Sequence, residues 1–273
     1  MKEQENIVLF DMDGTLTKPR QKIKSDMIRA VCELSNFAKI GIVTGSDYDY
    51  VVDQCLELWF DIGTVSPRNI MLMPCNGTKV YKWDDNNRNF SLVHDRDMRG
   101  DIGIKAYIDL LNTIVSYQLI ITAQNELPYS GTFFQYRGSM LNWCPIGRIA
   151  SKEEREAWKL VDEKDGIREY YLNCLTKRFD KESIPLAASL GGSTSIDIYP
   201  IGWDKTYSLK HLDNQKAWFI GDSCSLGGND WDIYTELNKH NRAYATTCPE
   251  KTIEIIKDII KQLKTVSSSA KNR

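Results

Sequence analysis

Two aspartates, Asp11 and Asp13, stand two positions apart directly after the apolar run Asn6–Phe10. Such a run predicts a buried strand, and sites in an open α/β sheet form where its strands end. Paired carboxylates bind hard cations such as Mg²⁺, and a carboxylate can also accept a phosphoryl group. A solvated turn would contain the same residues, so the pair alone leaves both interpretations open.

Three other segments favour phosphoryl chemistry. Asp222 and Asp230 follow another apolar run and can complete a magnesium site. The turn Thr44–Ser46 follows a third run and offers hydroxyl and N–H donors to a phosphoryl oxygen, while Lys205 offers a point charge for phosphate. Each segment is a weak signal by itself. The four together, in this order and with three at strand ends, form a specific pattern.

The elements that must position these segments follow two patterns of secondary structure along the chain. Short apolar strands at 6–10, 39–43 and 71–73 alternate with helical patterns, which indicates a parallel sheet covered on both faces. Beyond the polar run Asp84–Asn89, the residues on either side of Gly138 and Ser139 predict an antiparallel hairpin, and the first pattern resumes after Trp203. We therefore expect an α/β fold: a Rossmann-like core with a parallel sheet, residues 1–86 and 204–273, and an inserted α/β cap with an antiparallel sheet, residues 87–203.

Local patterns refine this expectation. Ser25 is a plausible N-cap of a helix, and Ser151 with Glu154 forms a capping box at the start of another. The segment 193–199 alternates polar and apolar residues, which places Ser195 and Asp197 on one face of a strand. That alternation by itself indicates no more than a polar strand face.

Composition excludes several classes of protein. The 35 basic and 37 acidic residues nearly cancel, which argues against a nucleic-acid-binding surface. No run approaches 18 uninterrupted apolar residues, so we expect no membrane span. The 7 cysteines are scattered without a CxxC pair, which fits reduced thiols in a cytosolic protein.

The four chemical segments resemble the motifs of the haloacid dehalogenase superfamily of phosphotransferases. Longer stretches, spread from residue 7 to 250, resemble the eukaryotic phosphomannomutases. These stretches lie at residues 11–20, 131–133, 145–148, 153–155, 202–205 and 227–230.

The resemblance implies roles for individual residues. Asp11 would be the nucleophile and Asp13 the acid/base, with Lys205 and Ser46 beside them. The substrate-binding residues would be Arg20, Arg137, Arg148, Arg155, Ser195 and Asp197. Mg²⁺ would be held by Asp11, the Asp13 backbone carbonyl, Asp222 and Asp230, and a second cation by Tyr234 and Glu236 in a loop at 234–239.

The implied reaction is the interconversion of mannose 6-phosphate and mannose 1-phosphate through an aspartyl-phosphate. A hexose 1,6-bisphosphate would be the activator and intermediate, and the product would feed GDP-mannose synthesis. The resemblance also implies a cytoplasmic homodimer formed through the cap, with no nucleic acid or membrane as a partner. Two alternatives stay open: a sugar-phosphate phosphatase built on the same core, and a non-catalytic binding protein that kept the fold.

The chain departs from the family pattern at four positions near the expected site. Cys75 and Gln135 stand where typical members have glutamate, and Ser130 and Ser223 stand where they have arginine and lysine. These differences remove two negative and two positive charges.

Overall fold

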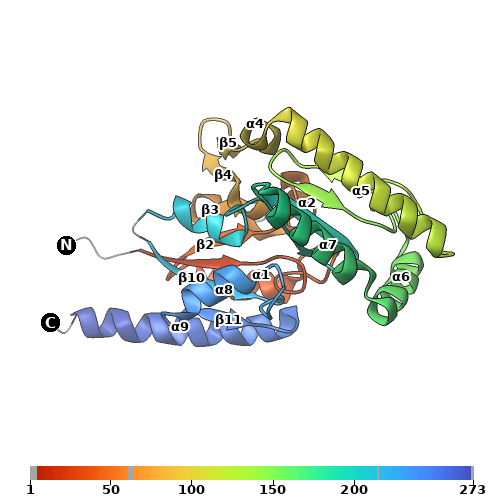
Figure 1. Cartoon of the computed structure of the whole chain (residues 1–273). Helices are drawn as coiled ribbons and strands as arrows, with labels where there is room; N and C mark the ends of the chain where they lie inside the picture. Colours follow the sequence, from red (N-terminus) through yellow and green to blue (C-terminus); the bar gives the residue numbers. More distant parts are fainter. Residues whose placement is uncertain (1–4, 61–63, 214, 272–273) are drawn as a thin grey trace. The chain divides into compact units, whose positions relative to one another are not determined.

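The computed structural model describes residues 5–60, 64–213 and 215–271, and the chain divides into two compact units (Figure 1). Unit 1 contains the chain up to Asp95, the segment Lys205–Leu226 and the chain from Asp230 onward. Unit 2 contains Arg96–Asp204 and Gly227–Asn229. Each unit has its own sheet.

The sheet of unit 1 has seven strands in the order β11-β10-β1-β2-β3-β4-β5. Neighbours from β11 to β3 pair in parallel, and β4 and β5 extend the sheet as an antiparallel hairpin. The strands are β1 Asn6–Phe10, β2 Lys39–Val43, β3 Ile70–Met73, β4 Lys79–Asp84, β5 Asn89–Asp95, β10 Lys216–Gly221 and β11 Ala243–Ala245. The parallel arrangement brings the ends of β1, β2 and β10 to one edge of the sheet, as the motif pattern requires.

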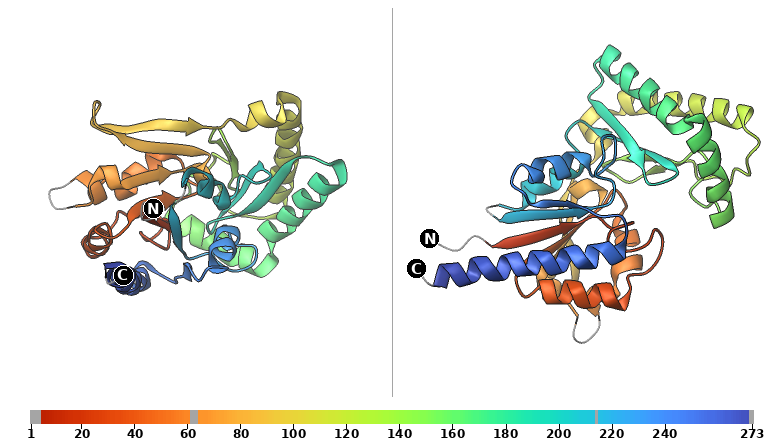
Figure 2. Two further views of the ribbon diagram at one scale, coloured as in Figure 1. Left: turned by 90° about the vertical axis from the view of Figure 1, so that its left-hand side faces the viewer. Right: turned by 90° about the horizontal axis from the view of Figure 1, so that it is seen from below.

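Helices cover both faces of this sheet. Alternate residues of β1 divide between two apolar clusters: Val8 and Phe10 pack in one, and Ile7 and Leu9 in the other. The first cluster includes residues of α1 and α9, which lie side by side in Figure 2, and the second includes residues of α8. The helices are α1 Ser25–Leu34, α2 Tyr48–Cys55, α3 Glu57–Phe60, α8 Trp231–Asn238 and α9 Pro249–Lys271, with short 3₁₀ helices η1 Pro67–Asn69, η2 Cys75–Gly77 and η3 Lys205–His211.

Unit 2 is built on a four-stranded antiparallel sheet in the order β6-β7-β9-β8. Its elements are α4 Met98–Ile102, α5 Ile104–Gln124, β6 Phe134–Tyr136, β7 Leu141–Trp143, α6 Lys152–Asp165, α7 Ile167–Glu182, β8 Leu186–Gly191 and β9 Ser195–Pro200. The ring of Trp143 lies 6.2 Å from that of Tyr117 in α5 and 5.9 Å from that of Tyr171 in α7. Because side chains alternate along a strand, Asn142 and Asp197 lie on the other face from these helices.

The predicted α/β fold class, the parallel sheet and the hairpin around Gly138 and Ser139 are confirmed. The capping box is also confirmed, since Ser151 Oγ accepts from the Glu154 N–H and Glu154 Oε2 accepts from the Ser151 N–H. The expected cap at Ser25 is wrong by one residue, because Lys24 occupies the N-cap position. The polar run Asp84–Asn89, at which the expected boundary between residues 86 and 87 falls, forms the turn between β4 and β5 within the sheet of unit 1.

Helix α5 is apolar and long enough, at 21 residues, to cross a membrane by length and composition alone. This is weak support for a membrane span, because a core helix of a soluble protein passes the same test. Here α5 packs through Tyr117 against Trp143, and Leu110, Ile114 and Ile121 are buried. We interpret α5 as a helix that packs on the sheet of unit 2 through one side.

Candidate active site

The ends of β1 and β10 meet at a buried ammonium group. The Asp11 N–H donates to the Ile220 carbonyl at 2.9 Å, which continues the pairing of the two strands by one residue. Asp11 and Lys205 are buried, and the Lys205 ammonium donates to one carboxylate oxygen each of Asp11 and Asp230. Segments that are 194 residues apart in the sequence therefore form one ion-paired cluster.

Two glycines make room for the carboxylates of this cluster. A Cβ at Gly14 would lie 2.2 Å from Asp222 Oδ2, and Gly14 also has a φ of +89°, which side chains disfavour. A Cβ at Gly221 would lie 2.5 Å from Asp230 Oδ2. Positions 14 and 221 therefore need glycine, because the carboxylates of Asp222 and Asp230 occupy the space that a side chain would take.

With Asp222, the cluster contains three carboxyl groups and one ammonium group. Burial raises the pKa of Asp11 well above its ordinary value, and the attraction of Lys205 only partly opposes this. Partial desolvation and the neighbouring Asp230 raise the pKa of Asp222, which is more exposed, to about 6. Burial alone would lower the pKa of Lys205, but the two carboxylates more than compensate, so it lies above its ordinary value. The lysine is therefore charged at neutral pH.

The three carboxyl groups could together hold a divalent cation. Among the described residues, Asp11, Asp222 and Asp230 each offer a carboxylate oxygen, and these oxygens lie within 4.8 Å of one another. Oxygen donors and net negative charge suit Mg²⁺. Both oxygens of Asp230 already accept, one from Lys205 and one from the Ser223 N–H at 3.0 Å. Asp11 and Asp222 are therefore the better placed to contact a cation directly.

Asp13 lies in a different environment from Asp11. Its Oδ1 accepts from the Arg20 backbone N–H and from the Tyr50 hydroxyl, each at 3.2 Å. Burial raises the pKa of Asp13, and these hydrogen bonds, together with the nearby Gln54 amide, act in the opposite direction. The structure thus brings Arg20 beside Asp13, although through its backbone, and it adds Tyr50 and Gln54, which the sequence did not single out.

The turn after β2 is tied to the turn after β3. The Ser46 carbonyl accepts from the Cys75 N–H at 2.9 Å, and the Thr44 carbonyl accepts from the Asn76 N–H at 2.8 Å. Both turns therefore lie at the carboxyl edge of the sheet with Asp11, so Ser46 is placed at the strand-end edge.

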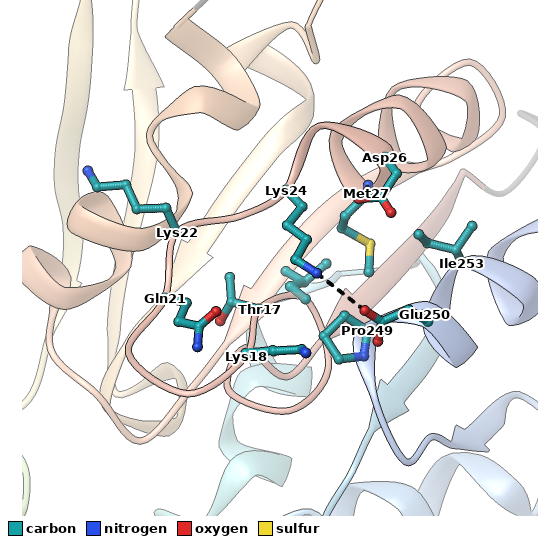
Figure 3. Close-up of a pocket in the computed structure, with 11 residues that line it drawn as sticks. Thr17, Lys18, Gln21, Lys22, Lys24, Asp26, Met27, Pro249, Glu250 and Ile253 are labelled. Carbon is teal, nitrogen blue, oxygen red and sulfur yellow. Dashed lines mark hydrogen bonds and ion pairs between the residues drawn. The ribbon is translucent and has the colours of Figure 1, made fainter. Parts of the chain in front are cut away.

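The loop that follows the first motif packs against the start of α9 (Figure 3). Lys24 pairs there with Glu250 at 3.4 Å, and Thr17 and Lys18 line the same pocket. The enclosed space is only about 10 Å³, which is about the room needed for one water molecule. This pocket anchors the loop but is too small for a sugar phosphate.

The predicted substrate-binding residues of unit 2 gather on the sheet face that α5 and α7 do not cover. Arg137 Nη1 lies 3.9 Å from Asp197 Oδ1, and Arg148 Nη1 donates to Asn142 Oδ1 at 2.9 Å. Ser195 Oγ lies 3.5 Å from the same Asn142 oxygen. The sequence did not single out Asn142, although a polar residue between Leu141 and Trp143 in a buried strand is a detectable signal.

Arg155 lies next to this group. Its Nη1 donates to Thr194 Oγ1 at 2.9 Å and its Nη2 to the Arg148 carbonyl at 2.6 Å. It therefore ties the segment before α6 to the turn before β9.

The expected loop at 234–239 is wrong, because residues up to Asn238 belong to helix α8. Residues two apart on a helix do not face each other, so Tyr234 and Glu236 point in different directions. The Glu236 carboxylate instead pairs with Lys239 at 2.5 Å. The second cation site at Tyr234 and Glu236 stays a prediction, to be judged on a helix and not on a loop.

A profile of the eukaryotic phosphomannomutases matches residues 27–262. The chain belongs to the eukaryotic phosphomannomutase family. It is 34% identical to phosphomannomutase 2 of Dictyostelium discoideum, covering 94% of this chain and 98% of that protein. It is also 34% identical to a phosphomannomutase of Encephalitozoon cuniculi, with 96% of each chain covered. Family membership confirms the resemblance that the motifs predicted.

Solved structures of other proteins share the fold. An IMP-bound IMP-nucleotidase of Plasmodium falciparum matches with a TM-score of 0.66 at 18% identity, covering 94% of this chain and 67% of that one. The C-terminal domain of the trehalose-6-phosphate phosphatase of C. albicans matches with a TM-score of 0.59 at 16% identity, covering 93% and 91%. At these identities the likeness concerns the fold alone.

Proposed function

We propose that this member of the family interconverts mannose 6-phosphate and mannose 1-phosphate through a phosphorylated Asp11. The observation that carries the proposal is the buried Lys205 ammonium between Asp11 and Asp230 at the strand ends. A nucleophilic carboxylate next to a fixed positive charge can approach a phosphate dianion with less repulsion. A solvated turn would have no reason to bury these three charges.

The proposed cycle needs one nucleophile and one acid/base. A carboxylate oxygen of Asp11 attacks a phosphorus atom of a hexose 1,6-bisphosphate, the bond from phosphorus to the sugar oxygen breaks, and Asp13 gives a proton to that oxygen. In the second half, the free hydroxyl of a bound mannose monophosphate attacks the phosphorus on Asp11, the bond between phosphorus and the Asp11 oxygen breaks, and Asp13 takes the hydroxyl proton, so that a hexose 1,6-bisphosphate forms. The hydrogen bonds from Tyr50 and the Arg20 N–H hold the Asp13 carboxylate for this exchange.

Mg²⁺ is the cation that we propose for the group Asp11, Asp222 and Asp230, with the Asp13 backbone carbonyl as a further ligand. When bound, it would neutralise negative charge on the phosphoryl oxygens during transfer. Asp230 would hold Lys205 and the Ser223 N–H in place, so that Lys205 faces Asp11 with or without substrate.

Unit 2 is proposed as the cap that binds the sugar phosphate. The sheet face away from α5 and α7 carries Arg137 and Arg148 together with Ser195 and Asp197. Guanidinium groups bind phosphate through paired N–H donors, and hydroxyl and carboxylate groups suit sugar hydroxyls. We propose that these residues hold the phosphate that is not reacting, in either orientation of the bisphosphate.

We further propose that the enzyme works in the cytoplasm as a homodimer formed through the cap and supplies mannose 1-phosphate for GDP-mannose. The 7 cysteines are free thiols, which fits a reducing compartment. The outer face of α5 exposes Val115, Leu119 and Ile120, which offers an apolar surface for a second copy.

The deciding experiment supplies mannose 1-phosphate with and without glucose 1,6-bisphosphate and follows mannose 6-phosphate and free phosphate. We expect mannose 6-phosphate to form only with the bisphosphate. The Asp11→Asn variant should lose turnover while its melting temperature stays nearly unchanged, because Lys205 keeps Asp230 as its ion-pair partner and the neutral amide avoids the cost of burying a carboxylate. Free phosphate as the main product would contradict the mutase and favour a phosphatase. Equal inactivity of wild type and variant would favour a binding protein.

A further inference from the structure

Asn142 lies at the centre of the polar face of unit 2, and the reaction scheme above gives it no role. We propose that Asn142 is a positioning residue, which orients Arg148 and Asp197 for the sugar phosphate through the two ends of its side-chain amide. This inference rests on the proposed function, because it assigns Asn142 to the same substrate-binding face.

The amide contacts three side chains. Asn142 Nδ2 donates to Asp197 Oδ1 at 2.6 Å, and Asn142 Oδ1 accepts from Arg148 Nη1 at 2.9 Å. The Ser195 hydroxyl lies 3.5 Å from the same Oδ1. A guanidinium can only donate and a carboxylate can only accept, so these neighbours fix which way the amide points.

The strand pairing holds Asn142 rigidly in this position. Asn142 lies in β7, the strand between β6 and β9, and it is directly opposite Gln135 on one side and Asp197 on the other. It is only 2% exposed, as expected for an amide whose donors and acceptors are satisfied inside the protein. The Asp197 carboxylate is confined from the other side, because a Cβ at Gly191 would lie 2.6 Å from Asp197 Oδ2.

The chemistry of this position favours an amide over a charged group. An amide oxygen orients the Arg148 guanidinium without cancelling its positive charge, whereas a carboxylate in the same place would weaken its attraction for phosphate. The amide N–H₂ gives Asp197 a hydrogen bond, and a carboxylate at 142 would repel Asp197 at this distance. Asparagine therefore orients a cation and an anion simultaneously and adds no charge of its own.

The test compares Asn142→Asp with Asn173→Asp, which makes the same change at an exposed site on α7 of the same unit. We expect Asn142→Asp to raise KM for mannose 1-phosphate, and the Kd for glucose 1,6-bisphosphate, by about tenfold or more, because hydrogen bonds to charged groups are strong. The Asn173→Asp control should stay within about twofold of wild type, as expected for a surface change.

A second substrate separates positioning from general damage. Acetyl phosphate has no sugar and no second phosphate, so its turnover at Asp11 should stay within about twofold of wild type in Asn142→Asp. Parallel losses with both substrates would overturn the proposal in favour of a purely structural role. Unchanged KM and Kd in Asn142→Asp would also overturn it.

If the Asn142→Asp variant does not fold, Asn142→Ala replaces it as the test variant. It removes both hydrogen bonds without adding charge, and we expect a rise of about threefold or more in the same KM and Kd; unchanged values would overturn the proposal. Failure of the proposed function can be distinguished from failure of the Asn142 proposal, because in the first case the wild-type protein would form no mannose 6-phosphate. The Kd for glucose 1,6-bisphosphate, measured by calorimetry, would still decide the role of Asn142.

Discussion

Lys205 is the residue on which the arrangement of the buried Asp11 and Asp230 carboxylates depends. Its side chain has no exposed surface and its ammonium pairs with Asp11 and Asp230. Taking one partner out of a buried ion pair leaves the remaining charge without compensation, which costs more than the pair itself contributes. The residue thus connects the stability of unit 1 to its chemistry.

We expect Lys205→Met to lower the free energy of unfolding by about 3–5 kcal/mol, because two buried carboxylates lose their counter-charge. Urea unfolding followed by circular dichroism measures this. The double variant Lys205→Met/Asp230→Asn removes one of the two stranded charges, so it should recover part of the loss. A loss below about 1 kcal/mol in the single variant would mean that the cluster is not held by this ion pair.

At the scale of elements, the short helices η2 and η3 connect the sheet edge to Lys205. His211, at the end of η3, donates from Nε2 to the Gly77 carbonyl of η2 at 2.8 Å. A Cβ at Gly77 would lie 2.7 Å from the Ser208 Cα, so the two helices touch closely at this glycine. The position of η3, and with it Lys205, is therefore fixed in part by a histidine.

This contact makes stability depend on pH. Burial lowers the pKa of His211, and nearby His94, Lys82 and Lys210 act in the same direction, while the hydrogen bond to Gly77 opposes them. The unfolded chain then takes up the proton more readily than the folded chain as pH falls below about 6.5. Folding stability contributed by neutral His211 is therefore present above that pH and is lost as pH falls.

We expect the melting temperature of wild type to fall more between pH 7 and pH 5 than that of His211→Gln, whose amide can still donate to Gly77 but does not titrate. Differential scanning calorimetry at a series of pH values gives both curves. Parallel curves would show that His211 contributes nothing to the pH dependence.

At the scale of the whole molecule, the apolar surface of α5 is the feature that the fold of unit 2 leaves exposed. Leu119 is 70% exposed and its neighbours Val115 and Ile120 are also exposed, while Ile114 and Ile121 on the opposite side of the helix are buried. A helix that is apolar on both sides can pack on its own sheet through one side and on a second copy of the chain through the other.

We expect Leu119→Lys to weaken self-association by about tenfold or more, because a charge would enter an apolar interface. Sedimentation equilibrium over a range of protein concentrations measures the dissociation constant. Phe60→Lys, at an equally exposed apolar residue of unit 1, is the matched control and should associate like wild type. A monomeric wild type, or a Leu119→Lys variant that associates normally, would contradict the proposed dimer surface.

Local sequence patterns predicted a substantial part of this fold. The strand Lys39–Val43 and the capping box at Ser151 appear where expected, because burial periodicity and capping act over a few residues. The predicted N-cap at Ser25 and the predicted loop at 234–239 were both wrong, and both concern where a helix begins or ends. Helix ends depend on tertiary packing, which the local sequence does not specify.

The sequence by itself determined the family and the order of the motifs along the chain, and it predicted Asp11 and Asp13 as the chemical pair. Only the tertiary structure showed that Lys205 is buried between Asp11 and Asp230, that Tyr50 donates to Asp13, and that Asn142 links Arg148 to Asp197. The reason is physical. A motif specifies which groups are present, but burial, hydrogen bonding and charge compensation arise between strands and helices that are far apart in the chain.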